Sequence, residues 1–128
     1  MDALFGTFDQ GTVIHGTEHI PTASLVWSEH KNFAGVFLKN LIAGEDTGGL
    51  LSCHLVRIEP NMFIGLHSHP DSMELHEVVA GSGRCETQNG IFPYAPGTIS
   101  VIPRNMPHEV HAGENGLYLL AKFVLLKP

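Results

Sequence analysis

Short runs of apolar residues alternate with turn residues along most of this chain, and the turns recur about every 8 to 12 residues. The run over residues 50–59 is unbroken, and its successive side chains point to opposite faces of an extended strand. Asn89-Gly90 is the strongest short hairpin signal. The only helix-like stretch is short, near residues 28–33. The pattern predicts roughly nine or ten strands. They are residues 12–14, 24–27, 33–42, 50–59, 62–69, 74–80, 84–88, 98–102, 108–112 and 117–126.

Consecutive strands joined by short turns, without crossover helices, favour antiparallel pairing. The rhythm of the turns is typical of a sandwich or a closed barrel, so we expect an all-β domain. Residues 1–22 are less regular, and we expect an N-terminal arm that packs on the barrel or on a neighbouring subunit. Residues 23–128 then form the barrel domain.

Composition narrows the function classes. The 128 residues fit one domain, and the formal net charge of −6 comes from scattered acidic residues without a basic run, which argues against nucleic-acid binding. No apolar stretch approaches the roughly 20 residues of a membrane span, and the first ten residues lack a signal pattern, so we expect a cytoplasmic protein. Cys53 and Cys85 are too few for a disulfide framework, and we expect small buried thiols, with a thiol in a pocket as the alternative for Cys85.

The candidate chemistry lies in four residues, His67, His69, Glu74 and His108. His67 and His69 are two positions apart, so in a strand they point to the same face. Three imidazoles and one carboxylate suit a first-row transition metal. Buried histidines that only make hydrogen bonds in an empty barrel are the alternative interpretation.

His76 follows Glu74 by two positions and faces the same interior on a regular strand. It is the candidate catalytic residue, as a general base near the substrate. An alternative metal ligand, a partner that orients a ligand, or a core histidine bonded to a polar neighbour are the other roles open to it.

Two segments resemble the conserved motifs of the cupin family. Residues 67–81 read HSHPDSMELHEVVAG, with two histidines around one residue, then a glutamate, then six residues and a glycine. Residues 97–108 read GTISVIPRNMPH, with the glycine, proline and histidine of the second motif. Both motifs occur in order with the expected spacing, so the chain is similar to small single-domain cupins.

Four positions depart from the family pattern. Asn61 and Asn105 stand where the motifs have glycine, and asparagine is the residue after glycine that best tolerates a positive φ. Ala112 replaces a terminal asparagine, and Glu77 stands where an aromatic residue is common, which predicts a more polar rim. The four ligand positions are intact.

The resemblance implies an antiparallel jelly-roll barrel in which His67, His69, Glu74 and His108 bind one divalent transition metal ion, Fe, Mn, Ni, Zn, Co or Cu. It implies a metal-dependent enzyme acting on a small organic substrate, with dioxygenase-like or Lewis-acid isomerase or lyase chemistry. A non-enzymatic module that binds a sugar or another metabolite is the alternative. We also expect a homodimer, for which the apolar residues 25–27 could supply the surface.

Overall fold

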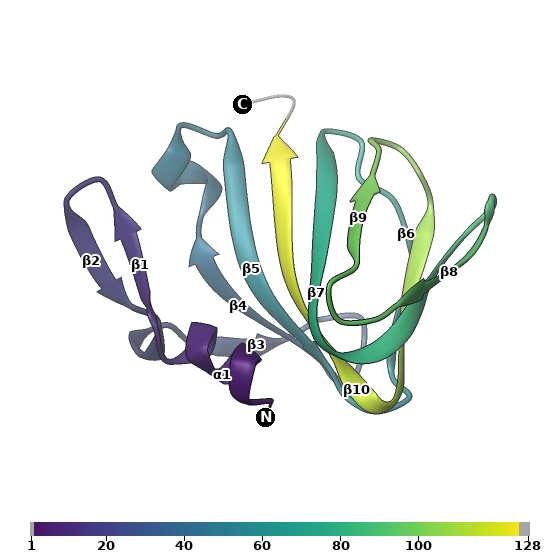
Figure 1. Cartoon of the computed structure of the whole chain (residues 1–128). Helices are drawn as coiled ribbons and strands as arrows, with labels where there is room; N and C mark the ends of the chain where they lie inside the picture. Colours follow the sequence, from purple (N-terminus) through teal and green to yellow (C-terminus); the bar gives the residue numbers. More distant parts are fainter. Residues whose placement is uncertain (1, 126–128) are drawn as a thin grey trace.

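A curled eight-stranded sheet forms most of the molecule (Figure 1). The computed structural model describes residues 2–125. Along the main path the strand order is β3-β4-β5-β10-β7-β8, while β6 pairs with β10 and β9 with β7. Every pairing within the described residues is antiparallel, which confirms the all-β class and the jelly-roll barrel. The strands of this sheet are β3 (Trp27–Glu29), β4 (Val36–Ile42), β5 (Leu51–Ile58), β6 (Phe63–His67), β7 (Ser72–Thr87), β8 (Gly90–Tyr94), β9 (Ile99–Ile102) and β10 (His108–Leu125).

Two strands are much longer than the sequence pattern predicts. β7 continues through Gly81, where a strand end was expected, and β10 joins the segments 108–112 and 117–126 as far as Leu125. Gly81 has φ 77°, and a Cβ at this position would collide with the carbonyl oxygen of Gly116 on β10. Gly81 therefore does not end the strand. It lets the backbones of β7 and β10 approach closely where both strands bend. Each long strand consequently continues through the bend and forms part of the barrel on both sides of it.

The N-terminal region holds a helix that the sequence pattern did not predict. α1 (Ala3–Asp9) begins after Asp2, whose carboxylate accepts hydrogen bonds from the backbone N–H groups of Leu4 and Phe5. This carboxylate satisfies two of the free donors at the helix start. Phe5 is fully buried, with its ring centroid 5.0 Å from that of Tyr118 on the outside of the sheet.

The helix-like stretch near residues 28–33 is not helical in the structure. Residues 27–29 form β3, which pairs with β4, and the His30 N–H donates to the Val36 carbonyl 2.7 Å away. Sheet pairing therefore outweighs the weak local helical tendency.

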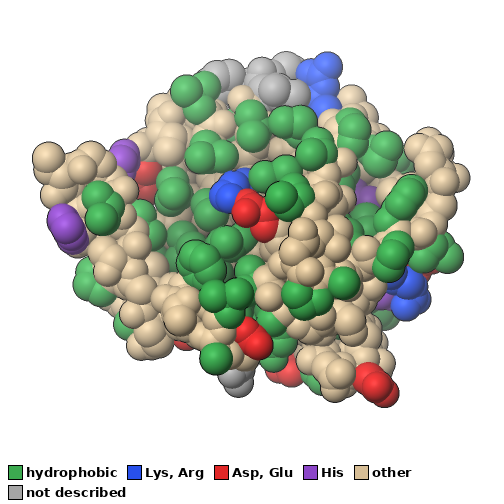
Figure 2. All heavy atoms as spheres, in the orientation of Figure 1, with side chains coloured by type: hydrophobic (Ala, Val, Ile, Leu, Met, Phe, Trp, Pro, Cys, Tyr) green, Lys and Arg blue, Asp and Glu red, His purple; other side chains and the backbone are tan. Residues whose placement is uncertain are grey.

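A small hairpin of β1 (Thr12–His15) and β2 (Glu18–Pro21) stands beside the main sheet, followed by the short 3-10 helix η1 (Thr22–Ser24). A second one, η2 (Gly44–Thr47), precedes β5. The division into an arm of residues 1–22 and a barrel of residues 23–128 stays a prediction, as does the homodimer. Apolar side chains gather on the outer face in Figure 2, and charged side chains are few there.

No helix within residues 2–125 is long and apolar enough to cross a membrane. Cys53 and Cys85 are buried and unpaired, as expected. Burial raises the pKa of both thiols, so both carry their protons at neutral pH.

Candidate metal centre

The barrel brings together the four residues that the sequence singled out. His67 ends β6 and His108 begins β10, and the two lie directly opposite one another in the register of these strands. Glu74 lies near the start of β7, and His69 lies in the loop between β6 and β7. The Asn105 N–H donates to the His69 carbonyl 2.9 Å away, which ties the second motif to the first. One donor atom from each of the four residues lies within 4.8 Å of the others.

The two asparagines at motif glycine positions adopt the expected backbone. Asn61 has φ 62° and Asn105 has φ 67°, and they are the only residues other than glycine with positive φ in the described part of the chain. Asparagine populates this region more readily than other side chains do. The turn that carries the Asn105–His69 hydrogen bond therefore survives without glycine.

Backbone carbonyls fix the orientation of two of the imidazoles. His67 Nδ1 lies 2.7 Å from the Gly65 oxygen, and His108 Nδ1 lies 2.9 Å from the Met106 oxygen. Because a carbonyl only accepts, Nδ1 of each ring carries the hydrogen. In the neutral ring, the Nε2 lone pair is then left for another partner, which is the arrangement that metal-binding histidines use.

Without a cation, the donor atoms at the centre lack suitable partners. His108 Nε2 lies 3.1 Å from Glu74 Oε1, so in the absence of a metal His108 must carry a second proton in order to donate to this carboxylate oxygen. His69 Nε2 is buried without a hydrogen-bond partner among the described residues, and lies 3.6 Å from Glu74 Oε1, too far for a hydrogen bond. Buried polar atoms are normally paired. A cation between them would satisfy all of these atoms, so the residues fit a metal ion.

The charges within the cluster depend on one another. Burial alone would raise the pKa of Glu74, but hydrogen bonding to the surrounding histidines, with His108 foremost, lowers it far below its usual range. Burial would also lower the pKa of His108, yet its contact with Glu74 raises it. Burial lowers the pKa of His67. Glu74 is therefore a carboxylate at neutral pH, and it is held in a ring of histidines.

His76 lies behind Glu74, as its position on the strand predicted. Its Nε2 is 3.0 Å from Glu74 Oε2 and its Nδ1 is 2.8 Å from the Tyr94 hydroxyl, and only 2% of the residue is exposed. Tyr94 is also buried, and burial raises the pKa of its hydroxyl, which stays protonated. Sequence reasoning missed Tyr94, because no motif marks β8 and the contact depends on the curvature of the sheet.

A cavity of about 100 Å³ opens beside the cluster. The ligand residues His67, His69 and Glu74 contribute to its wall together with His76. The rest of the wall is mainly apolar, and comprises His30, Leu38, His54, Val56, Ile64, Leu119, Ala121 and Phe123. No sequence motif marks His30, His54 or Phe123 as part of this wall.

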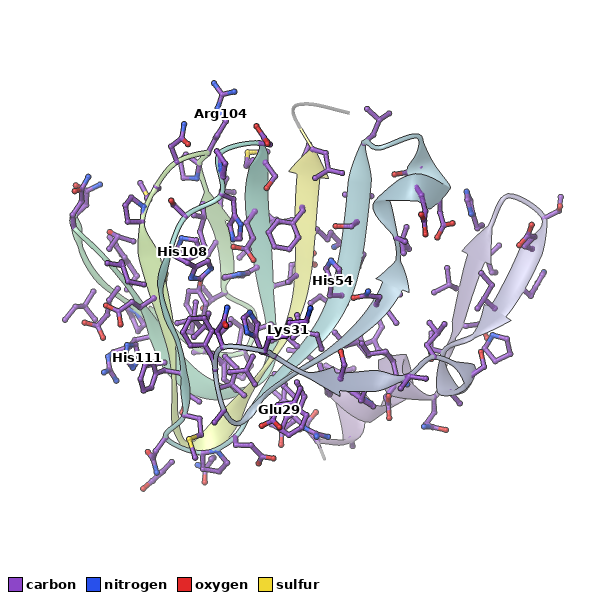
Figure 3. All side chains as sticks on the ribbon, turned by 180° about the vertical axis from the view of Figure 1, so that it is seen from behind. Glu29, Lys31, His54, Arg104, His108 and His111 are labelled. Atoms are coloured by element: carbon purple, nitrogen blue, oxygen red, sulfur yellow. The ribbon has the colours of Figure 1, made fainter. Side chains whose placement is uncertain are left out.

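His111 lies three positions after His108 on β10, on the opposite face of the strand, and points away from the centre (Figure 3). Its Nε2 lies 3.2 Å from a Glu86 oxygen and 3.3 Å from a Glu109 oxygen. Its ring stacks on Phe63, with the centroids 4.9 Å apart. By contrast, Figure 3 shows His108 between the strands, inside the barrel.

Solved structures share this fold. A Thermotoga maritima protein described as a predicted oxalate decarboxylase has a TM-score of 0.76 and 19% identity, covering 84% of this chain and 98% of that one. A cupin-2 domain from Rhodospirillum rubrum has a TM-score of 0.66 and 18% identity, covering 79% and 68%. Bacillus subtilis oxalate decarboxylase, which has Mn(II) centres, has a TM-score of 0.68 and 21% identity, covering 83% and 29%. At these identities the likeness establishes the cupin fold alone.

Among curated proteins, none matches this chain. A family model does: the AraC-like ligand-binding domain matches residues 51–121, which include β5 to β9, most of β10 and all four residues of the cluster. This match covers more than half of the chain. The chain is therefore a small cupin that belongs to the family of AraC-like ligand-binding domains.

Proposed function

We propose that His67, His69, Glu74 and His108 bind one divalent transition metal ion, and that the loaded centre catalyses a reaction of a small organic molecule in the barrel. The observation that carries this proposal is the buried His69 Nε2, which has no hydrogen-bond partner within residues 2–125 and lies 3.6 Å from Glu74 Oε1. A purely structural cluster would give this nitrogen a partner.

The ion would supply Lewis acidity and, if it is redox-active, a site for dioxygen. Fe, Mn, Ni, Zn, Co and Cu all accept imidazole ligands. Mn(II) is the first ion to test, because a structural neighbour, the Bacillus oxalate decarboxylase, has Mn(II) centres. Four protein donors leave two positions of a six-coordinate ion for small ligands, which is what an open catalytic site requires.

Two residues behind the centre, Tyr94 and His76, determine the orientation of the Glu74 carboxylate. The protonated Tyr94 hydroxyl donates to His76 Nδ1, so His76 carries its hydrogen on Nε2 and donates it to Glu74 Oε2. Glu74 Oε1 then faces His108 and His69. Tyr94 and His76 therefore hold the carboxylate with one oxygen directed at the centre.

His76 is the group that we propose to transfer a proton. It lines the cavity, and its Nε2 proton is shared with Glu74 Oε2, within reach of whatever the centre holds. The apolar wall, including Phe123, excludes bulk water from this exchange.

A non-enzymatic binding module is the second candidate, and the match to AraC-like ligand-binding domains favours it. In such a module the barrel holds a small molecule without converting it. The ligand would then depend on the cavity wall more than on the ion, so its affinity should survive the substitution His69→Ala.

Metal analysis of tag-free protein grown in defined metals tests the proposal first, because a histidine tag brings ligands of its own. We expect about one ion per chain in the wild type and none in His69→Ala with the fold retained. Dioxygen uptake and product analysis with small phenols, diketones and thiols then test for turnover. Wild-type protein that stays metal-free in the presence of all six metals contradicts the proposal. Turnover lost on His69→Ala supports an enzyme, whereas ligand affinity that survives it supports the binding module.

A further inference from the structure

The distribution of charge around the cavity indicates which molecules the centre accepts. Of the residues that the structure describes, no lysine or arginine lines the cavity, and the only carboxylate there is Glu74. With neutral imidazole ligands, a divalent ion and Glu74 together carry a net charge of about +1. One negative charge on the bound molecule therefore neutralises the centre, and a second has no partner.

The basic side chains of the described chain are occupied elsewhere or stand outside the cavity. Lys39 pairs with Asp9, Arg84 with Glu86 and Lys122 with Glu77. Arg57 lies over the rings of Trp27 and Phe37, 5.0 and 4.6 Å from their centroids.

Lys31 and Arg104 are exposed and contribute nothing to the wall. Figure 3 shows Arg104 at the rim, pointing away from the barrel. Arg57 and Arg84 do not line the cavity either.

The rest of the wall is suited to an apolar body. Leu38, Val56, Ile64 and Leu119 contribute aliphatic surface. Phe123 meets the ring of His69 edge-on at 5.0 Å and that of His54 at 5.7 Å. His54 offers no charge, because burial lowers its pKa and its two nitrogens lie 2.6 Å from Asn40 Oδ1 and 3.1 Å from Ser52 Oγ. A second carboxylate against this wall would lose its hydration without compensation.

The cavity is also small. Its volume of about 100 Å³ lies well below the roughly 300 Å³ at which pockets for drug-sized ligands begin. The two positions that the protein leaves on a six-coordinate ion suit two neighbouring oxygen atoms of one molecule.

We propose that the centre takes a small organic monoanion that presents two neighbouring oxygen atoms to the ion and an apolar body to the wall. A 2-oxo monocarboxylic acid is of this class, whereas a dicarboxylate such as oxalate is not. This inference rests on the proposed metal site and goes beyond it, because it sets this chain apart from the oxalate decarboxylases that share its fold.

Pyruvate and oxalate make a matched pair of probes, since they are close in size and both chelate through adjacent oxygens. They differ in that a methyl group replaces a charged carboxylate oxygen. In water the dianion binds a divalent cation more strongly by Coulomb attraction. We expect the protein loaded with Mn(II) to reverse this order and to bind pyruvate at least about tenfold more tightly than oxalate.

The readout is displacement of water from bound Mn(II), followed by proton relaxation and by Mn(II) EPR during titration with each anion. Leu38→Lys adds a cation to the wall, and Leu38→Met is its uncharged control. We expect the lysine variant alone to shift the preference towards oxalate by about tenfold. Lys31→Gln should leave the preference unchanged, because Lys31 does not line the cavity.

The outcomes distinguish the proposed metal site from the proposed substrate class. If Mn(II) and the other five metals fail to bind, the metal site and this inference both fall. If Mn(II) binds and oxalate is preferred as it is by the ion in water, only the substrate class is overturned. If Leu38→Lys folds poorly, the ratio for the wild type still decides the matter.

Discussion

Two buried clusters of charged side chains lie on opposite sides of the sheet, and they differ in how they are completed. Outside the barrel, the arm cluster consists of Asp9, Thr22, Trp27 and Lys39. Lys39 Nζ lies 2.6 Å from Asp9 Oδ1 and donates to the Thr22 carbonyl at 2.8 Å. The same Asp9 oxygen accepts from Trp27 Nε1 at 2.9 Å.

Inside the barrel, the metal centre of His67, His69, Glu74 and His108 leaves the buried His69 Nε2 without a partner in the described part of the chain. The arm cluster contains its own cation, so it needs nothing from outside the chain. The metal centre has the geometry for a cation and none of its own. Burial of charge alone therefore does not mark a functional site, and the informative feature is whether donors and acceptors within the cluster match.

The largest expected effect is on the affinity of the metal centre for its ion. His69→Ala removes one of four ligands, so the affinity for Mn(II) should fall by more than the roughly 10–100-fold that loss of an outer hydrogen-bond partner costs. His111→Ala is the matched control, because His111 points away from the centre. Isothermal titration with Mn(II) measures both variants. Equal losses in the two, or no loss in His69→Ala, would contradict the assignment of His69 as a ligand.

The ligand set could be read from the sequence because each part of it is local. The two-residue spacing of His67 and His69 and the spacings within each motif survive any curvature of the sheet. Asn61 and Asn105 were equally predictable, since positive φ depends on the residue and its turn.

The cavity wall could not be read in the same way. Phe123 meets Glu74 only through the register of β10 with β7, and Tyr94 meets His76 only because β8 curls over β7. Such contacts depend on how the long strands bend. Because of the same bending, β7 and β10 each contain segments that the turn signals had predicted to be separate strands. α1 was missed for another reason, because its seven residues are too short for a helical period to stand out.

The second-largest expected effect is a loss of unfolding free energy, and it should follow substitution of the arm cluster without a change in metal affinity. Lys39→Met leaves the Asp9 carboxylate without its cation, and breaking such a buried pair costs about 3–5 kcal/mol of unfolding free energy. Affinity for Mn(II) should be unchanged, because Lys39 lies outside the barrel. Urea unfolding of the metal-free protein gives the free energy.

A double substitution sharpens this result. Asp9→Asn together with Lys39→Met removes both charges, and it should recover much of the lost stability. A single Lys39→Met variant as stable as the wild type would show that the pair does not hold the arm to the sheet.

A smaller effect tests how the metal centre is supported from behind. Tyr94→Phe removes the hydroxyl that hydrogen-bonds to His76 Nδ1, so the tautomer of His76 and the orientation of Glu74 are less firmly fixed. We expect Mn(II) affinity to fall by about tenfold. The Mn(II) EPR spectrum should also broaden as Glu74 takes up a second orientation, which a loss of packing alone would not cause. An unchanged spectrum and an unchanged affinity would show that Tyr94 does not help to orient Glu74.

The smallest effect is the contribution of Asp9 to stability as a function of pH. Burial alone would raise the pKa of Asp9, but its hydrogen bonds to Lys39 and Trp27 lower it below the ordinary value of 3.8. A carboxyl with a lowered folded-state pKa stabilises the protein above its unfolded-state pKa and loses this contribution as the pH falls through the folded value. The difference in unfolding free energy between the wild type and Asp9→Asn should therefore be constant from about pH 7 to about pH 5, and shrink below about pH 4.

Urea unfolding of the two metal-free proteins measures that difference, and Glu74 cancels from it because both proteins contain Glu74 in the same surroundings. A difference that grows towards acid pH would mean that the folded protein holds Asp9 protonated. The arm cluster would then fail to supply that carboxylate with an effective cation. A difference that shrinks supports the pairing of the Asp9 carboxylate with Lys39.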